Sequence, residues 1–134
     1  MNILVIDAQG GGIGKQLVME IKRSFPSVTV TAVGTNSLAT SAMLKAGADY
    51  AATGENAVVV CSRKTDVIIG PIGIVIADSL LGEITPRMAL AVAQSSAKRI
   101  LIPVNHCDNL VAGVDDLNTR KLIQDAIDKL QAFN

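Results

Sequence analysis

The chain has 134 residues, enough for one domain with a proper core, and we treat 1–134 as a single domain. Its 12 Lys and Arg residues balance its 12 Asp and Glu residues, so no net field draws it to nucleic acid or to a membrane surface. With two Phe, one Tyr and no Trp, it also lacks the stacking platforms of proteins that bind single-stranded nucleic acid.

The first element is a buried strand over 3–6, followed by a glycine cluster and a helix that ends near Ser24. Glycines allow a sharp turn and keep side chains away from the main-chain N–H groups. Because N–H groups at the start of a helix favour an anion, this pattern predicts a site for the phosphates of a nucleotide. The residues expected to hold these phosphates are Gly10, Gly11, Gly12, Ile13 and Gly14, with Gln9 as a further cofactor contact.

The glycine cluster fits no phosphate-binding motif completely. In the dinucleotide motif G-x-G-x-x-G, Gln9 stands at the first glycine; in the short-chain-dehydrogenase pattern, Ala8 stands at a glycine position. In the P-loop motif, Gln16 replaces the hydroxyl residue that would hold Mg²⁺. The alternative is that the glycines only let the helix pack closely on the sheet. For Asp7, we prefer a carboxylate that ties down its own glycine turn over a contact to a ribose or metal.

The second strand, over 28–33, ends in Gly34-Thr35-Asn36. NAD sites usually carry Asp or Glu at this point to bind the ribose 2′-OH. In the absence of that carboxylate, we expect Thr35 and Asn36 to contact the ribose. No negative charge would then repel the 2′-phosphate of NADP, although no Arg nearby completes an NADP site. The expected cofactor is therefore NAD or NADP, and another nucleotide or small phosphorylated ligand stays open.

The rest of the chain alternates strand and helix without a linker or repeat. Further strands are predicted over 49–52, 66–69, 99–104 and 110–114. Helices are predicted over 38–46, 57–64, 74–81, 86–96 and 115–133, and the last of them places Ile123, Ala126, Ile127, Leu130 and Phe133 inward. The helix over 38–46 is apolar or small all round, so we expect it to lie in a subunit interface.

Strands that are apolar on both faces and joined by helices predict an α/β fold. We expect a single Rossmann-like three-layer domain with a mostly parallel sheet of about six strands. Ligands of such sheets lie beyond the carboxyl ends of the strands. The loops expected to meet there are 7–14, 34–37, 70–73 and 105–109, with Pro71 and Gly73 as further ligand contacts.

Other polar residues offer weaker candidates for function. Glu83 and Asn105 lie near predicted turns and are either a general base or substrate anchor, or solvated loop residues. Asp78 follows an apolar run as in a Walker B site, but the predicted helix over 74–81 argues against that role. The consecutive residues 106–108 (His, Cys, Asp) point in different directions, so we expect no metal.

Four segments together resemble a known family. They read D-A-Q-G-G-G-I-G-K over 7–15, G-T-N-S-L-A-T-S-A-M-L-K-A-G-A-D over 34–49, T-G-E-N-A over 53–57, and I-I-G-P-I-G-I-V-I-A-D-S-L-L-G-E-I-T-P over 68–86. They are similar to short bacterial proteins grouped as domain of unknown function 3842. The resemblance implies a single Rossmann-like domain and supplies no activity.

The sequence thus predicts a nucleotide- or dinucleotide-binding protein. The alternatives are a regulatory or sensory module that binds a ligand without turnover, and a Rossmann-like domain that binds no nucleotide. No acid, base or nucleophile over the glycine loop is identifiable, so the catalytic residues, and whether there is an enzyme at all, stay open. Only 18% of the residues are charged, so we expect part of the surface to be covered by another subunit in a homo-oligomer. The N-terminus has no basic region, and Asp7 interrupts its apolar run, so we expect a cytoplasmic protein.

Overall fold

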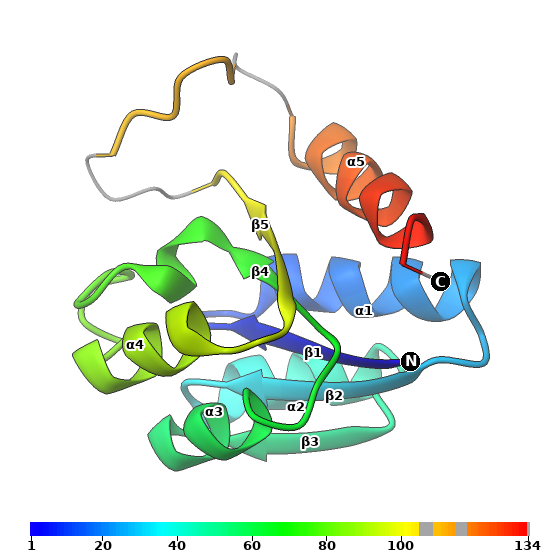
Figure 1. Ribbon diagram of the computed structural model, residues 1–134. Coiled ribbons are helices and arrows are strands. Elements are labelled where there is room, and N and C mark those ends of the chain that lie inside the picture. The colour runs from blue at the N-terminus through cyan, green and yellow to red at the C-terminus, as the bar shows by residue number, and fades with distance from the viewer. Residues whose placement is uncertain (105–108, 115–117, 134) are drawn as a thin grey trace.

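The computed structural model describes residues 1–104, 109–114 and 118–133. Within them, five parallel strands form one sheet in the order β3-β2-β1-β4-β5 (Figure 1). This order reverses between β1 and β4, as in a Rossmann-like sheet. The strands are β1 (Asn2–Asp7), β2 (Thr29–Gly34), β3 (Tyr50–Thr53), β4 (Val67–Pro71) and β5 (Lys98–Ile102).

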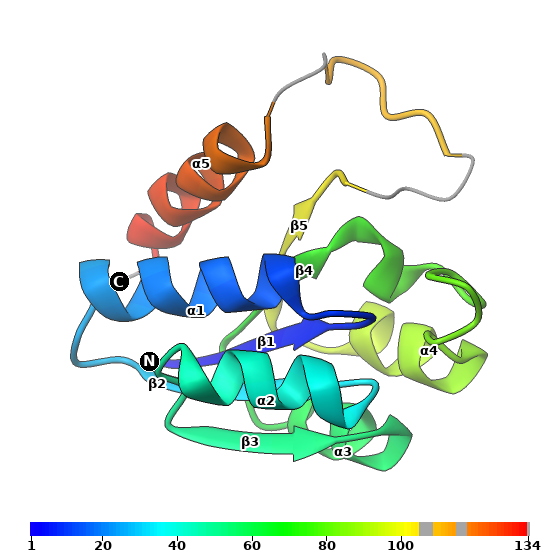
Figure 2. The ribbon, with the colours of Figure 1, turned by 180° about the vertical axis from the view of Figure 1, so that it is seen from behind.

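Helices cover both faces of the sheet and make it the middle of three layers. They are α1 (Gly12–Ser24), α2 (Ser37–Lys45), α3 (Glu55–Cys61), α4 (Pro86–Gln94) and α5 (Thr119–Gln131). The helices α1, α2 and α5 pack on one face and α3 and α4 on the other, as the two opposite views show (Figures 1 and 2). The expected three-layer α/β fold is confirmed, with five strands in the described part of the chain in place of about six.

The central strand β1 sends alternate side chains to the two faces because successive residues of a strand point in opposite directions. Ile3 and Val5 join the cluster under α1, whereas Leu4 and Ile6 join the cluster under α4. All four are at most 1% exposed. Both faces of β1 therefore lie in the core. Because β1 is the middle strand, its carboxyl end lies at the centre of the edge where the parallel strands end.

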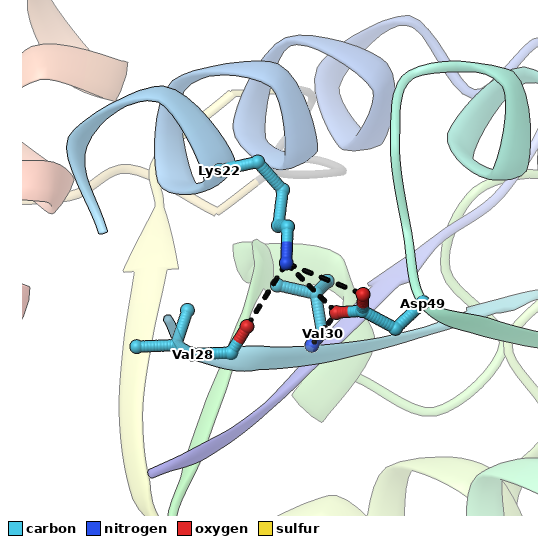
Figure 3. Close-up of polar contacts among 4 residues, drawn as sticks. All are labelled: Lys22, Val28, Val30 and Asp49. Carbon is cyan, nitrogen blue, oxygen red and sulfur yellow. Dashed lines mark hydrogen bonds and ion pairs between the residues drawn. The ribbon is translucent and has the colours of Figure 1, made fainter. Parts of the chain in front are cut away.

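A polar cluster at the opposite edge of the sheet ties α1 to β2 (Figure 3). Lys22 Nζ of α1 lies 3.0 Å from Asp49 Oδ2 and donates to the carbonyl oxygen of Val28 at 3.0 Å. Asp49 Oδ2 also accepts from the N–H of Val30 at 2.8 Å. The end of α1, the start of β2 and the residue before β3 are thereby held together.

The predicted helix over 57–64 is confirmed as α3, and the predicted helix over 86–96 is confirmed as α4. Thr85 Oγ1 accepts from the N–H of Met88, and Pro86 is the first helical residue. Of the residues expected inward on the last helix, Phe133 is 45% exposed because the helix ends before it, at Gln131. The other four are buried, as expected.

Two predicted elements are wrong. The segment 74–81 is not an α-helix: a 3₁₀ turn, η1 (Ile72–Val75), is followed by left-handed turns. The segment 110–114 forms no strand, and Leu110 is 94% exposed. Periodicity misleads in both places because short apolar runs suit helix, strand and packed loop alike. The last helix begins at Thr119 within the described residues, while 115–117 lie outside them.

Candidate functional site

The carboxyl ends of β1, β2 and β4 meet at one edge of the sheet, and the glycine loop lies over them. A cavity of about 250 Å³ opens at this point. We call it the glycine-loop cavity. Its lining residues are Asp7, Ala8, Gln9, Gly10, Gly11, Gly12, Ile13, Gln16, Pro71, Leu80 and Thr119. It lies at the topological switch point between β1 and β4, where ligands of open α/β sheets bind.

The start of α1 presents open main-chain groups to this cavity. Within the described residues, the N–H groups of Gly12 and Ile13, the first two of the helix, have no acceptor. Gly10 and Gly12 are exposed, and a Cβ added to either would meet no atom within 4 Å. The loop surface here therefore allows a ligand to approach the backbone closely.

The other two glycines of the cluster serve packing. Gly11 has a φ of 74°, and a Cβ on it would lie 2.8 Å from the Cα of Ala39 in α2. A Cβ on Gly14 would lie 2.9 Å from the Cβ of Asp7 and would also collide with Met43. Close packing thus accounts for Gly11 and Gly14, as in the alternative interpretation of the cluster, whereas it leaves Gly10 and Gly12 unexplained.

Gln9 occupies the first glycine position of the dinucleotide motif and has a φ of 52°. This left-handed conformation normally favours glycine, because a side chain there costs roughly 1–2 kcal/mol. The backbone of Gln9 is therefore strained where the glycine loop turns. Such strain persists only where the surrounding structure holds it, and it is concentrated at functional sites.

Asp7 ties down the glycine turn, as predicted. Its Oδ1 accepts from the N–H of Ala8 at 2.8 Å, and its Oδ2 accepts from the N–H of Gly14 at 2.7 Å. Burial raises the pKa of the Asp7 carboxyl, these two N–H groups partly offset that rise, and the charge of Glu83 adds to it. The N–H of Gly14 is consequently engaged inside the protein and is not open to the cavity.

Glu83 joins the glycine loop to the loop after β2. Its Oε1 accepts from the N–H of Gln9 at 2.9 Å, from Thr35 Oγ1 at 2.7 Å and from Asn36 Nδ2 at 2.8 Å. Asn36 also donates to the carbonyl oxygen of Gln9, and its Oδ1 caps α2 by accepting from the N–H of Ala39. Burial raises the pKa of Glu83, but the three donors outweigh it and hold the pKa below its usual range.

The segment that carries Glu83 is a strained, self-bonded loop. Asp78, Leu80 and Leu81 all have φ between 55° and 64°. Its backbone closes on itself, because the N–H of Asp78 donates to the carbonyl oxygen of Ile84 at 2.7 Å and the N–H of Ile84 to that of Ser79 at 3.2 Å. Asp78 itself is exposed on this turn and does not follow a strand, so the Walker B comparison fails.

The structure brings most of the predicted site residues together. Gln9, Gly10, Gly11, Gly12, Ile13 and Pro71 line the cavity. Thr35 and Asn36 do not line it, but both donate to Glu83, which also accepts from the N–H of Gln9. Gly14 is buried beneath α1, and Gly73 is packed against Ser79 and Leu80 and does not line the cavity. Residues 105–108 lie outside the described residues. They include Asn105 and the three residues at which we expect no metal.

Three lining residues, Gln16, Leu80 and Thr119, were missed by the sequence analysis. Gln16 lies one helical turn after Gly12, so helical periodicity would have found it. Leu80 and Thr119 come from segments remote in the chain and carry no local signal. Within the described residues, no cluster of His, Cys, Asp and Glu suits a metal ion, and no helix is long and apolar enough to cross a bilayer.

The chain belongs to the family described as domain of unknown function (DUF3842), whose model matches residues 2–134. A comparison with curated proteins finds no match. Among solved structures, the chain is similar to a dodecameric FMN-dependent UbiX-like decarboxylase from Escherichia coli O157:H7, with 19% identity over 98% of this chain and 76% of the other and a TM-score of 0.46.

A second similar structure is the apo form of saccharopine dehydrogenase (L-Glu forming) from Saccharomyces cerevisiae. The identity is 14%, and the match covers 84% of this chain and 22% of the dehydrogenase, with a TM-score of 0.50. At such low identity the likeness concerns the fold alone.

Proposed function

We propose that this member of the DUF3842 family binds a nucleotide or dinucleotide, with NAD or NADP as the expected ligand. The observation that carries the proposal is the pair of open N–H groups of Gly12 and Ile13 at the glycine-loop cavity. These groups and the dipole of α1 favour a phosphate. The position beyond the carboxyl end of β1, at the switch point of the sheet, is where dinucleotides bind in Rossmann-like folds.

The residues at the cavity fit the pyrophosphate of such a ligand. Gly10 and Gly12 leave the space that a Cβ would fill, and Gly12 and Ile13 supply donors. The cavity, at about 250 Å³, lies below the roughly 300–1,000 Å³ of sites that enclose a drug-sized ligand. The proposed role of the cavity is therefore to hold the phosphates, while Thr35 and Asn36 face the ribose and Gln9 and Pro71 border the site.

A bound nicotinamide cofactor would supply hydride chemistry. Binding without turnover is the second candidate, and the environment of the two nearest carboxylates favours it. Both oxygens of Asp7 accept main-chain N–H groups, and Glu83 Oε1 accepts three donors. Hydrolysis of a nucleoside triphosphate ranks below both, because Gln16 lacks the hydroxyl that a P-loop uses to hold Mg²⁺.

Thermal unfolding with and without NAD, NADP, ATP, GTP and FMN tests the proposal. A ligand present at about a hundred times its Kd stabilises the native state by about 2.7 kcal/mol, which is readily measured. We expect a dinucleotide to raise the unfolding temperature in a concentration-dependent way and ATP with Mg²⁺ to release no phosphate. If none of the five ligands shifts the transition, the nucleotide-binding proposal is wrong and the ligand-free Rossmann-like domain replaces it.

We also propose that the chain forms a homo-oligomer through α2. A groove of about 530 Å³ runs between α1 and α2, lined by Lys15, Met19, Leu38, Ser41, Ala42, Lys45 and Ala46. Leu38 is 67% exposed and Met19 is 48% exposed. Apolar side chains that gather on one exposed face typically mark a protein contact. A second copy of the same chain is the occupant that a small, weakly charged domain favours.

A further inference from the structure

The end of β2 lacks an acid in the sequence, yet the fold brings one to it. Glu83 lies 48 residues after Thr35 in the chain, and its Oε1 is 2.7 Å from Thr35 Oγ1. The same oxygen is 2.9 Å from the main-chain nitrogen of Gln9 in the glycine loop. This carboxylate thus stands between the glycine loop and the end of β2, where NAD sites place the residue that binds the ribose 2′-OH.

Only half of this carboxylate is used by the protein. Oε1 takes all three donors, from Gln9, Thr35 and Asn36, whereas Oε2 has no partner in the described part of the chain. The side chain is only partly buried, so Oε2 is within reach of a ligand. An ionised carboxylate accepts hydrogen bonds and donates none. It therefore suits the hydroxyls of a ribose and repels a phosphate at the same place.

The position of Glu83 is held by the packing of residues on both sides of it in the chain. Leu80 is 5% exposed and Ile84 is 1% exposed, so both sides of the loop are anchored in the core. Ser79 Oγ donates to the carbonyl oxygen of Gly73, which fixes the loop to η1. With Asp78, Leu80 and Leu81 in left-handed conformations, the loop keeps a shape that costs free energy. A strained but anchored loop gives a preorganised carboxylate.

Cations that would favour a 2′-phosphate are absent from the three loops that meet at Glu83. The segments 7–14, 34–37 and 76–84 contain no Lys or Arg. An NADP site ordinarily uses an Arg to accommodate the extra phosphate. This end of the site carries the negative charge of Glu83, which is near enough to Asp7 to raise the pKa of the Asp7 carboxyl.

From this geometry we infer that Glu83 binds the ribose hydroxyls of the ligand and makes the site select a free 2′-OH over a 2′-phosphate. This inference rests on the proposed dinucleotide function and narrows its ligand to NAD. It reverses the expectation from the sequence, where no carboxylate was visible to reject the 2′-phosphate of NADP.

Calorimetric titration of NAD, NADP and 2′-deoxy-NAD into three proteins tests the inference. The proteins are the wild type, Glu83→Gln and the control Glu20→Gln, which makes the same change on α1, where Glu20 pairs with Arg23. We expect the wild type and the control to bind NAD at least about tenfold more tightly than NADP, because juxtaposed like charges cost several kcal/mol. In Glu83→Gln, we expect weaker binding of NAD, tighter binding of NADP, and nearly equal affinities.

The outcomes separate the two proposals. If NAD binds and its preference over NADP is missing in the wild type or unchanged in Glu83→Gln, the role of Glu83 is wrong while the dinucleotide site stands. If neither dinucleotide binds the wild type, the dinucleotide function fails and the role of Glu83 fails with it. Should Glu83→Gln not fold, the comparison of NAD with 2′-deoxy-NAD on the wild type decides, because equal affinities contradict a contact to the 2′-OH.

Discussion

The four glycines after β1 differ in the space around them, and this difference separates the glycines that close packing requires from those that it leaves open. Gly11 and Gly14 have neighbouring atoms within 3 Å of an added Cβ, whereas Gly10 and Gly12 have none within 4 Å. A motif read from the sequence treats all four alike. The structure assigns the open surface to Gly10 and Gly12, so substitutions there test the site without disturbing the fold.

Gly12→Val should abolish nucleotide binding and leave stability within about 0.5 kcal/mol of the wild type. Gly12 is exposed at the first helical position, so a side chain there covers the open N–H groups and displaces nothing. Binding is measured by titration with the ligand found in the thermal screen, and stability by urea unfolding. Wild-type affinity in this folded variant would remove the glycine loop from the site.

Gly11→Val provides the contrast. Its positive φ and the backbone of Ala39 both oppose a side chain, which costs about 1–2 kcal/mol for the conformation and about 1–3 kcal/mol for overpacking. We expect a lower midpoint of urea unfolding in the absence of ligand. A variant as stable as the wild type would show that α2 can move away from the loop, contrary to the packing described here.

Asp7 makes stability depend on pH in a defined direction. Its pKa is raised from 3.8 in the folded protein, chiefly by burial. A carboxyl with a raised folded pKa contributes stability that is present below the unfolded value and is lost as the pH rises through the folded value. The free energy of unfolding of the wild type should therefore fall relative to that of Asp7→Asn as the pH rises above 3.8 toward neutral. A relative rise over this range would contradict the assignment.

At the scale of elements, the Lys22–Asp49 cluster joins the end of α1 to β2 and β3 (Figure 3). The N–H of Val30, and after it Lys22, holds the pKa of Asp49 below 3.8. Such a group contributes stability that is present above 3.8 and is lost as the pH falls through the lower folded value. The cluster is therefore an acid-sensitive connection on the side of the sheet away from the cavity.

Lys22→Met should lower the free energy of unfolding at neutral pH by up to about 1 kcal/mol, the upper range for exposed ion pairs. The side chain of Lys22 is 24% exposed, and it also donates to the carbonyl oxygen of Val28. Lys129→Met is the matched control, because Lys129 and Asp125 are 60% and 62% exposed on one helix and should contribute little. Equal effects of the two changes in urea unfolding would show that the cluster adds nothing beyond a surface pair.

At the scale of the whole molecule, the groove between α1 and α2 is the surface where we expect a second copy. Ala42 lines this groove and is half-buried, so a larger side chain there projects into the groove more than into the core. Ala42→Glu should convert an oligomer into a folded monomer, because a charge placed in an apolar contact loses its hydration. Size-exclusion chromatography with light scattering measures the change.

Ala91→Glu is the control for this surface. Ala91 is also half-buried and lines a groove beside α4, on the other face of the sheet. It should leave the oligomer intact. A monomeric wild type, or an oligomer unaffected by Ala42→Glu, would show that α2 is not the interface.

Local signals in the sequence were sufficient for much of the fold. The strand–glycine–helix start and the helix that begins at position 86 were predictable because periodicity and turn conformation depend on neighbouring residues. The parallel sheet followed from strands apolar on both faces. The same signals failed for 74–81 and 110–114, where a short apolar run carries no preference of its own.

By itself, then, the sequence determined the alternation of strands and helices and the place of the glycine loop at the carboxyl end of the first strand. Only the tertiary structure decided which glycines are open and which are packed, since that depends on where α2 and Met43 pack. It also decided that Glu83 meets Thr35, 48 residues away, because the loop between β4 and α4 stays at the carboxyl edge of the sheet, where β2 also ends. Contacts between distant segments follow from how the layers pack, and no local pattern encodes them.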